Sequence, residues 1–330
     1  MKGVMFALAW MAVVSADPLS SLAGQLNLST QWNAQFPSGP ISSSTTAAAQ
    51  IAQNWGLPTR SFFGSTTNLA FVADPFSNSS GSTVLQVQYP QGSYNPGSVS
   101  SGAPSGGTEF YSSPFGNQTF NEALLTYSVG FAPNFPWVLG GKLPGLYGGD
   151  TKAGCSGGSQ STGSNCWSMR LMWRAGGAGE AYAYIPSDSS FCSQANVICN
   201  PDYGKSLARG SFTFTAGSWT QVQMHIKLND PSQSNGILQV WANGNLAINM
   251  NNVKYHTTNM VLLNIFFFST FFGGNTQDYA TTSTTYTYYK DISMAVGPQV
   301  QPSNSGANHL TPGFQHLAIL TLLVATWLGA

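Results

Sequence analysis

Apolar and polar residues alternate in short runs along most of this chain. Val84–Tyr89 and Thr220–Leu228 carry apolar side chains at alternate positions, which is the period of a β-strand with one buried face. Ile237–Ala242 and Leu246–Ile248 alternate in the same way, and the intervening Asn243–Asn245, with its central glycine, predicts a tight hairpin turn. The pattern therefore predicts a protein built mainly from antiparallel strands.

Three other segments complete the expected fold. Val261–Phe272 is apolar almost throughout, so we expect a strand buried on both faces. Thr282–Tyr289 is rich in the strand formers Thr and Tyr, and Ser44–Trp55, with a capping hydroxyl and an alanine run, is the one good helix candidate. Short strands separated by Gly, Pro and Ser turns favour an all-β fold, a two-sheet antiparallel sandwich or jelly roll with a concave groove.

Trp167–Arg174 and Glu180–Ile185 predict the two strands of a hairpin around the glycine-rich residues 175–179. One face of this hairpin would carry the side chains of Ser168, Arg170, Met172, Arg174, Glu180, Tyr182 and Tyr184. If the loop closes symmetrically, Arg174 lies opposite Glu180. Arg170 then lies opposite Tyr184, with Tyr182 on the diagonal. A cation, a hydroxyl and two phenols on one sheet surface would suit an anionic sugar.

The composition limits the possible partners. Charged residues make up 7% of the chain, against roughly 25% in average globular proteins, and the formal net charge is zero. No basic patch is present, which excludes nucleic-acid binding, and any attraction for a polyanion must be local. The abundance of small polar residues, with aromatic residues at 13%, is typical of a secreted β-rich protein.

Both ends of the chain resemble processing signals. Residues 1–16 have a lysine, an apolar run and a small-residue cleavage site, which predict a signal peptide. Residues 303–330 have small residues, a polar spacer and an apolar tail, which predict a linker and a GPI-anchor signal, the alternative being a plain C-terminal extension. We therefore expect one domain over 17–302, secreted or held at the cell surface by a lipid anchor. Sequons predict glycosylation at Asn27, Asn78 and Asn117.

The four cysteines are Cys155, Cys166, Cys192 and Cys199. In an oxidising compartment an even number predicts two disulfides, for which three pairings are possible. Pairing of neighbours, Cys155 with Cys166 and Cys192 with Cys199, is favoured because each pair brackets a loop rich in Gly, Ser or Asn. A zinc site is the competing interpretation, but the spacing lacks a second close pair of ligands.

Two further polar residues are candidates for the groove. Lys142 lies in the run Gly140–Gly149, where a loop or strand end could direct its ammonium at a ligand, and a solvated turn lysine is the alternative. The glycines that end this run favour turn geometry, since no helix follows to complete a phosphate loop. His225 shares a polar strand face with Lys227, so it could line the groove, although a surface histidine is the simpler interpretation.

Carboxylates are scarce, with eleven acidic residues in the whole chain. We find no obvious pair placed for general acid/base catalysis, which most glycoside hydrolases need. Glu109 and Glu180 are possible, but the expected register pairs Glu180 with Arg174. This leaves Arg170 without an evident acidic partner, which favours a substrate anion over a structural ion pair.

Three stretches resemble polysaccharide lyase family 14, namely Gly140–Gly149, Trp167–Pro186 and Phe268–Gly274. The similarity extends over roughly Phe71–Val296. The resemblance implies a β-jelly-roll enzyme acting on alginate or β-1,4-glucuronan, with a functional set of one lysine, a Ser-x-Arg pair and a Tyr-x-Tyr pair. The matching residues here are Lys142, Ser168, Arg170, Tyr182 and Tyr184.

The mechanism that this resemblance implies is β-elimination at a uronate. Arg170 and Lys142 would bind the carboxylate and stabilise the developing enolate, and Ser168 would hold the substrate by a hydrogen bond. We assign Tyr184 as the base and Tyr182 as the acid, an order that the sequence leaves open. Because free tyrosine titrates near pKa 10, we expect a neutral-to-alkaline optimum. The residues present require no metal or organic cofactor.

The substrate and the class of protein stay open at this point. Glucuronan and alginate present the same carboxylate, and a lipid-anchored surface protein favours glucuronan; endo or exo action depends on loops that the pattern does not describe. The rival to a lyase is a non-catalytic carbohydrate-binding cell-wall protein. An enzyme requires Lys142, Arg170, Tyr182 and Tyr184 to converge on one point of the concave face. We expect a monomer whose partner is an acidic polysaccharide.

Overall fold

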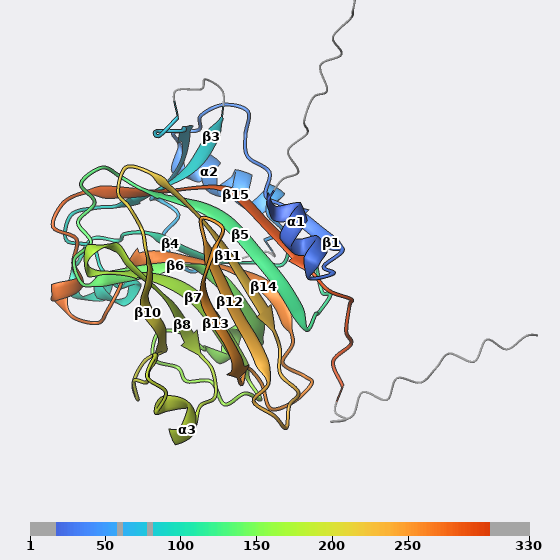
Figure 1. The fold of residues 1–330 in the computed structure, drawn as a ribbon. Coiled ribbons are helices and arrows are strands. Elements are labelled where there is room, and N and C mark those ends of the chain that lie inside the picture. Colours follow the sequence, from blue (N-terminus) through green and yellow to red (C-terminus); the bar gives the residue numbers. More distant parts are fainter. Residues whose placement is uncertain (1–17, 58–61, 78–81, 304–330) are drawn as a thin grey trace, which may run out of the picture.

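Two antiparallel β-sheets stacked face to face form most of the structure, a computed structural model that describes residues 18–57, 62–77 and 82–303 (Figure 1). Sheet A has the order β13 (Asn245–Val253), β12 (Gly236–Ala242), β11 (Trp219–Lys227), β5 (Glu122–Phe131), β15 (Thr285–Val296), β3 (Thr83–Tyr89) and β2 (Leu69–Ala73), and β1 (Thr30–Asn33) pairs with β15. Sheet B has the order β4 (Thr108–Ser112), β14 (Leu263–Phe272), β6 (Gly140–Gly149), β7 (Cys166–Arg174), β8 (Ala178–Tyr184), β10 (Lys205–Thr213) and β9 (Val197–Ile198). The expected all-β jelly roll is confirmed.

Helices are short and peripheral in the described residues. They are α1 (Pro18–Gln25), α2 (Ser44–Asn54) and α3 (Ser189–Cys192), with 3₁₀ turns at Pro96–Ser101, Thr151–Ala153, Ala175–Gly177 and Gln277–Tyr279. α2 is the expected helix, and the Ser43 side chain caps it by accepting a hydrogen bond from the Thr46 N–H. None of these helices has the length and apolar character needed to cross a membrane.

The strands follow the sequence pattern closely. Between β12 and β13, Asn243 and Gly244 both have positive φ, as a two-residue turn of this kind requires. On β11, Val222, Met224 and Ile226 all face the core, as the alternation predicted. β14 is buried on both faces for most of its length, which also agrees with its apolar sequence.

The core lies between the sheets, and alternate residues of β7 face towards it and away from it. Trp167, Met169, Leu171 and Trp173 point into the core, where they join the main apolar cluster. The alternate residues of β7 point to the outer face of sheet B, where Met172 packs with Tyr182 and Tyr184 in a smaller cluster. Sheet B therefore has one face that stabilises the fold and one face that carries polar groups.

β6 corrects our expectation for the glycine-rich run. Lys142 lies within a ten-residue strand rather than in a loop or turn, and the glycines at its end continue the strand. These glycines have a packing role: a Cβ on Gly141 would lie 2.1 Å from the Trp173 ring, and one on Gly148 would lie 2.4 Å from the Trp167 ring nitrogen. At these two positions the strand needs glycine because tryptophan rings of β7 pack against it.

Both expected disulfides are present, Cys155–Cys166 and Cys192–Cys199. All four cysteines are used in these bonds, so they do not form the alternative zinc site. His225 corrects the expectation of a surface or groove residue: it is 2% exposed on sheet A, where its ring bonds Glu122 and Gln239.

Several expectations concern segments outside the described residues. The signal peptide over 1–16, the anchor signal from 304 onwards and the sequon at Asn78 all lie there. The other two sequon residues, Asn27 and Asn117, are exposed and would be accessible to glycosylation.

Candidate active site

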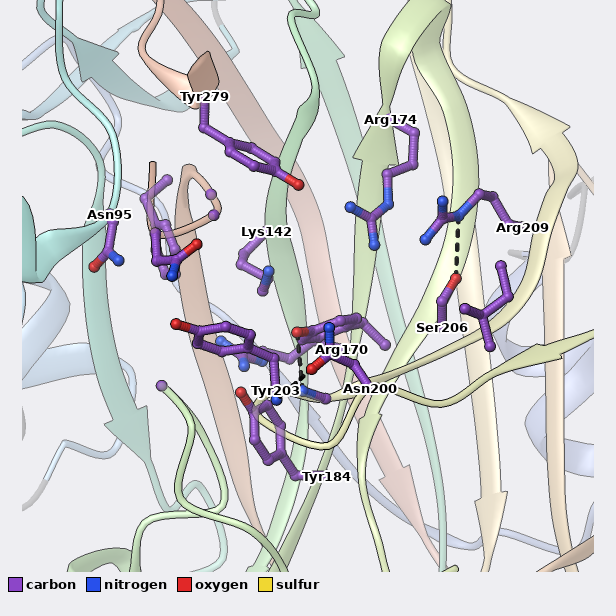
Figure 2. A pocket seen from close by; sticks show the side chains of 18 of the residues that line it. Asn95, Lys142, Arg170, Arg174, Tyr184, Asn200, Tyr203, Ser206, Arg209 and Tyr279 are labelled. Carbon is purple, nitrogen blue, oxygen red and sulfur yellow. Dashed lines mark hydrogen bonds between the residues drawn. The ribbon is translucent and has the colours of Figure 1, made fainter. Parts of the chain in front are cut away.

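A cavity of about 350 Å³ opens on the outer face of sheet B (Figure 2). Strands β6, β7, β8 and β10 form its floor, and loops around Asn95, Asn200 and Asn275 form its rim. Four of the five residues that the sequence singled out line it, namely Lys142, Arg170, Tyr182 and Tyr184. The convergence that we required of an enzyme is therefore present.

Lys142 projects into the middle of this cavity (Figure 2). Its ammonium lies 4.1 Å from the centre of the Tyr182 ring, and the side chain is only 7% exposed. Among the described residues it forms no ion pair within 4.0 Å. Burial, and then the neighbouring Arg170 and Arg174, hold the pKa of Lys142 well below its usual value. An anion in the cavity would offset the free-energy cost of keeping the Lys142 ammonium charged.

Arg170 is anchored from below by a chain of hydrogen bonds. Its Nη1 donates to Ser269 Oγ at 2.9 Å, and Ser269 Oγ donates to Glu109 Oε1 at 2.8 Å. Ser269 and Glu109 are paired across β14 and β4. β6 lies between β14 and β7, but the β6 residue paired with Arg170 is Gly145, which has no side chain to block the reach.

The hydrogen bonds from Arg170 through Ser269 to Glu109 correct our expectation that Arg170 has no acidic neighbour. Glu109 is 8% exposed and lies close enough to Arg170 and Lys142 for both cations to stabilise its charge. Burial nevertheless has the larger effect, and the pKa of Glu109 is raised above its usual value. Because Glu109 reaches Arg170 only through Ser269, the other guanidinium nitrogens of Arg170 remain available, and its Nε is buried without a partner.

Tyr182 and Tyr184 stand side by side on β8. Their ring centroids are 5.9 Å apart, and each hydroxyl oxygen accepts a backbone N–H at 3.0 Å, from Gly204 and Gly158 respectively. Burial raises the pKa of Tyr182 well above its usual value, although Arg170 acts in the opposite direction. Burial thus outweighs the neighbouring cation at Tyr182, which therefore keeps its proton.

The register of the hairpin differs from the symmetric closure that we expected. Arg170 is paired with Tyr182, Ser168 with Tyr184 and Met172 with Glu180. The register moves because the chain reverses one residue earlier, at Gly176 and Gly177, which both adopt positive φ. The shift by two positions leaves all these side chains on the same face and brings Arg170 closer to Tyr182.

Ser168 takes a different position from the one that we expected. It is fully buried and does not line the cavity, and its hydroxyl donates to the Cys155 carbonyl oxygen at 2.6 Å. Cys155 opens the loop that carries Gly158, the donor to the Tyr184 hydroxyl. In this structure, therefore, Ser168 supports the loop beside the tyrosines instead of facing a ligand.

The second end of the cavity contains a pair of arginines around one carboxylate. Arg174 Nη2 lies 2.5 Å from Glu180 Oε1, as the sequence predicted, and Arg209 Nε lies 2.7 Å from Glu180 Oε2. Ser206 also donates to Glu180. Sequence patterns did not indicate Arg209 or the rim residues, because they come from an irregular part of β10 and from loops. The polar pair Ser269-Thr270 inside the apolar β14 was the one available signal for the support of Arg170.

The part of the cavity around Tyr182 and Tyr184 therefore combines two phenols with two buried cations, Lys142 and Arg170. The cations can bind a carboxylate, and the phenols can move protons at an atom next to it. Because these side chains are buried, their electrostatic interactions with a ligand are stronger than they would be in water.

Comparisons with known proteins give a match to one family model and to several solved structures. The family model of polysaccharide lyase 14 matches residues 77–292. A marine PL-14 alginate lyase from Aplysia kurodai is 31% identical with a TM-score of 0.66, over 79% of this chain and 100% of that chain. The fold is also that of alginate lyase Aly36B (20% identity, TM-score 0.59, covering 82% of this chain and 98% of that chain). Alginate lyase vAL-1 from Chlorella virus has it too (23%, 0.55, covering 67% and 87%). A comparison with curated protein sequences gives no significant match.

Proposed function

The chain belongs to polysaccharide lyase family 14 and is a polysaccharide lyase, and on this basis we propose that it cleaves a polyuronate by β-elimination in the cavity of sheet B. The observation that carries the proposal is the convergence of Lys142, Arg170, Tyr182 and Tyr184 on one cavity. A carbohydrate-binding protein without activity would not need two desolvated cations beside two buried phenols.

In the proposed reaction, Arg170 and Lys142 bind the carboxylate of the sugar residue that is cleaved. Loss of the C5 proton places a second negative charge next to this carboxylate, and the two cations stabilise that charge as it develops. The C5–H electron pair forms the C4–C5 double bond, and the C4–O4 bond breaks. The products are a chain that begins with an unsaturated uronate and a chain with a new reducing end, whose anomeric carbon keeps the glycosidic oxygen as a hydroxyl group.

The two tyrosines divide the proton transfers. Tyr184 removes the C5 proton, and the N–H of Gly158 stabilises the charge that its oxygen carries as the phenolate. Tyr182 gives its proton to the departing O4, a role that suits a phenol whose pKa is raised by burial. After the products leave, Tyr184 returns its proton to solvent and Tyr182 regains one.

Alginate is the first substrate to test. The alginate lyase from Aplysia kurodai is 31% identical to this chain, which outweighs the earlier preference for glucuronan that rested on a surface anchor alone. Glucuronan remains the alternative, because the carboxylate that the cations bind is the same. We further propose that the enzyme is exported through its signal peptide and held at the cell surface by a GPI anchor, an environment in which its two disulfides are stable.

The direct test is to incubate the purified protein with alginate and with glucuronan and to follow the ultraviolet absorbance of the unsaturated product. We expect absorbance to rise with at least one of the two polymers. Arg170→Ala and Tyr184→Phe should each abolish turnover while the circular dichroism spectrum is retained. A folded protein that gives no product with any polyuronate would overturn the proposal, and a Tyr184→Phe variant of near wild-type activity would move the base elsewhere.

A further inference from the structure

The arginine pair at the second end of the cavity is not used by the proposed reaction. The chain has only four arginines, and three of them, Arg170, Arg174 and Arg209, line this one cavity. Figure 2 shows the guanidinium groups of Arg174 and Arg209 at the same side of the cavity, away from Tyr184. In a protein of zero net charge, this concentration of arginine needs a specific explanation.

The charges in this pair do not balance. Glu180 is fully buried and carries one negative charge, while the two guanidinium groups carry two positive charges. One arginine would be enough to neutralise Glu180 and to close the hairpin between β7 and β8. The second arginine therefore leaves an excess positive charge at the wall of the cavity.

The hydrogen-bond donors are also in excess. Arg174 uses Nη2 on Glu180, and Arg209 uses only Nε, which it shares between Glu180 and Ser206. The Nε of Arg174 is buried without a partner. Within the part of the chain that the structure describes, neither terminal nitrogen of Arg209 donates a hydrogen bond, and this side chain is 42% exposed. A guanidinium group has five donors in a planar fork that fits a carboxylate.

Arg209 is the member of the pair that lies farther from the reacting centre, since Arg174 is near enough to Lys142 to lower its pKa. Arg174 is four residues after Arg170 on β7, which corresponds to about 13 Å along a strand. Arg209 is on β10, three strands from Lys142 on β6, which corresponds to about 14 Å across the sheet. A carboxylate held between Arg170 and Lys142 therefore lies closer to those two groups than to Arg209. Both groups face the same cavity, so a chain that fills it would place a different sugar residue beside the pair.

We propose that Arg174 and Arg209, oriented by Glu180, form a second anion subsite that binds the carboxylate of a neighbouring uronate in the same polysaccharide chain. Glu180 fixes the two guanidinium groups before substrate arrives, so little side-chain freedom is lost on binding. This inference rests on the proposed function and adds to it a requirement for consecutive acidic sugars. A chain in which neutral sugars alternate with uronates would lose this contact.

Arg209→Gln is the informative substitution, because Arg209 is partly exposed and Arg174 still neutralises Glu180 in its absence. The matched control is Lys227→Gln, which removes one positive charge from sheet A on the other side of the molecule. Both changes are made in the Tyr184→Phe background, so that binding is measured without cleavage. The probes are sodium alginate and glucuronan, each compared with its methyl-esterified, uncharged form, and binding is measured by calorimetry.

We expect Arg209→Gln to weaken binding of the charged polymer by about tenfold, since a hydrogen bond to a charged group is lost. Binding of the esterified polymer should stay unchanged, and Lys227→Gln should bind as tightly as its parent. Equal affinities of the Arg209→Gln and Lys227→Gln proteins for the charged polymer would overturn the subsite. Lyase activity in the wild-type protein would still support the proposed function in that event, so the two failures are distinguishable.

A kinetic measurement separates binding from simple positioning. In the active enzyme, Arg209→Gln should raise KM for the polymer about tenfold and change kcat by less than about twofold, because the lost contact is the same in the ground and transition states. Arg209→Lys keeps the charge but not the planar fork of donors, so its KM should lie between those of the wild type and Arg209→Gln. If kcat of Arg209→Gln instead fell about tenfold and KM stayed unchanged, Arg209 would act on the reacting centre. That result would also overturn the subsite.

Discussion

Lys142 carries its ammonium in a position that disfavours charge. Burial and two neighbouring arginines lower its pKa in the folded protein, whereas in the unfolded chain the value is near 10.5. The folded state therefore loses stability as the pH falls from about 10.5 through the lowered pKa. This loss remains at pH 7 and vanishes above pH 10.5.

Replacement of Lys142 by an uncharged residue should therefore raise stability and lower activity. We expect Lys142→Met to unfold at higher urea concentration than wild type at pH 7, with the difference shrinking towards pH 10.5. The same variant should lose at least about 100-fold in kcat/KM, because a cation at the developing charge is gone. A Lys142→Met protein that is less stable than wild type at pH 7 would contradict this account of the site.

The lowered pKa of Lys142 also predicts the alkaline side of the pH profile. Because the ammonium must be protonated to bind the carboxylate, kcat/KM should fall as the pH rises, and it should do so well below pH 10.5. The profile of Lys142→Arg should keep its alkaline limb to higher pH, since arginine does not deprotonate in this range. Identical alkaline limbs in the two proteins, measured under the same buffer conditions, would assign the fall to another group.

Ser269 is a third residue whose removal should be informative. Ser269→Ala takes away the acceptor of Arg170 and the donor to Glu109 in a buried place, which should cost about 1–3 kcal/mol of unfolding free energy. KM should rise as well, because Arg170 loses its anchor. The exposed Ser232→Ala serves as the control and should change stability by less than about 0.5 kcal/mol. Chemical denaturation and steady-state kinetics of both variants check this.

Sequence patterns predicted the residues of the site better than their surroundings. The cavity set of Lys142, Arg170, Tyr182 and Tyr184 followed from a family resemblance and from period-two alternation, which fixes the face of a strand. The support of Arg170 did not follow, because Glu109 and Ser269 are 160 residues apart and meet only through the pairing of β4 with β14. The orientation of Ser168 was also out of reach, since it depends on a loop closed by a disulfide.

At the scale of elements, the β7–β8 hairpin and the loop from Cys155 to Cys166 act together. The loop accepts a hydrogen bond from Ser168 on β7 and donates one to Tyr184 on β8. The register of the hairpin could not be derived from the sequence, because five loop residues allow the reversal to be centred at more than one glycine. Face and chain direction were predictable, and the pairing was not.

The disulfide at this loop should therefore influence catalysis as well as stability. Replacing Cys155 and Cys166 by alanine removes a link across eleven residues, which should lower the unfolding free energy by about 2–3 kcal/mol. We expect kcat to fall several-fold, because the Gly158 N–H no longer holds Tyr184. The double variant Cys192→Ala/Cys199→Ala should lose comparable stability with a smaller effect on kcat. Equal kcat values in the two double variants would contradict a specific role for the first loop.

At the scale of the whole molecule, the two-sheet fold was predictable and the order of its strands was not. Alternation identified β3, β7, β8, β11, β12 and β13, and composition identified β14 and β15. Neighbours in sheet B such as β14 and β6 are more than 100 residues apart, and nothing local in either strand specifies the partner. The packing of Trp167 and Trp173 against Gly148 and Gly141 could not be predicted either, since glycine-rich segments more often form turns than strands.

The overall charge predicts how the enzyme responds to salt. The net charge is zero, so little long-range attraction draws an acidic polymer towards the cavity. We expect kcat/KM to change by less than about threefold between 0.01 M and 0.1 M salt, over which the Debye length falls from about 30 Å to about 10 Å. A fall of tenfold or more, seen in initial rates on a long polymer, would require an extended basic surface that the described residues do not contain.

The close packing of β6 against the Trp167 and Trp173 rings has a consequence for protein engineering. Gly141 and Gly148 admit no larger residue, and Leu143 and Leu146 belong to the core, so the floor of the cavity offers almost no position for redesign. New sugar preferences would have to be built from above, in the loops that carry Asn95, Asn200 and Asn275. Libraries aimed at a different polymer are best confined to the side chains of those loops, since the loop backbone bonds sheet B, as the Asn95 N–H does with the Phe272 carbonyl oxygen.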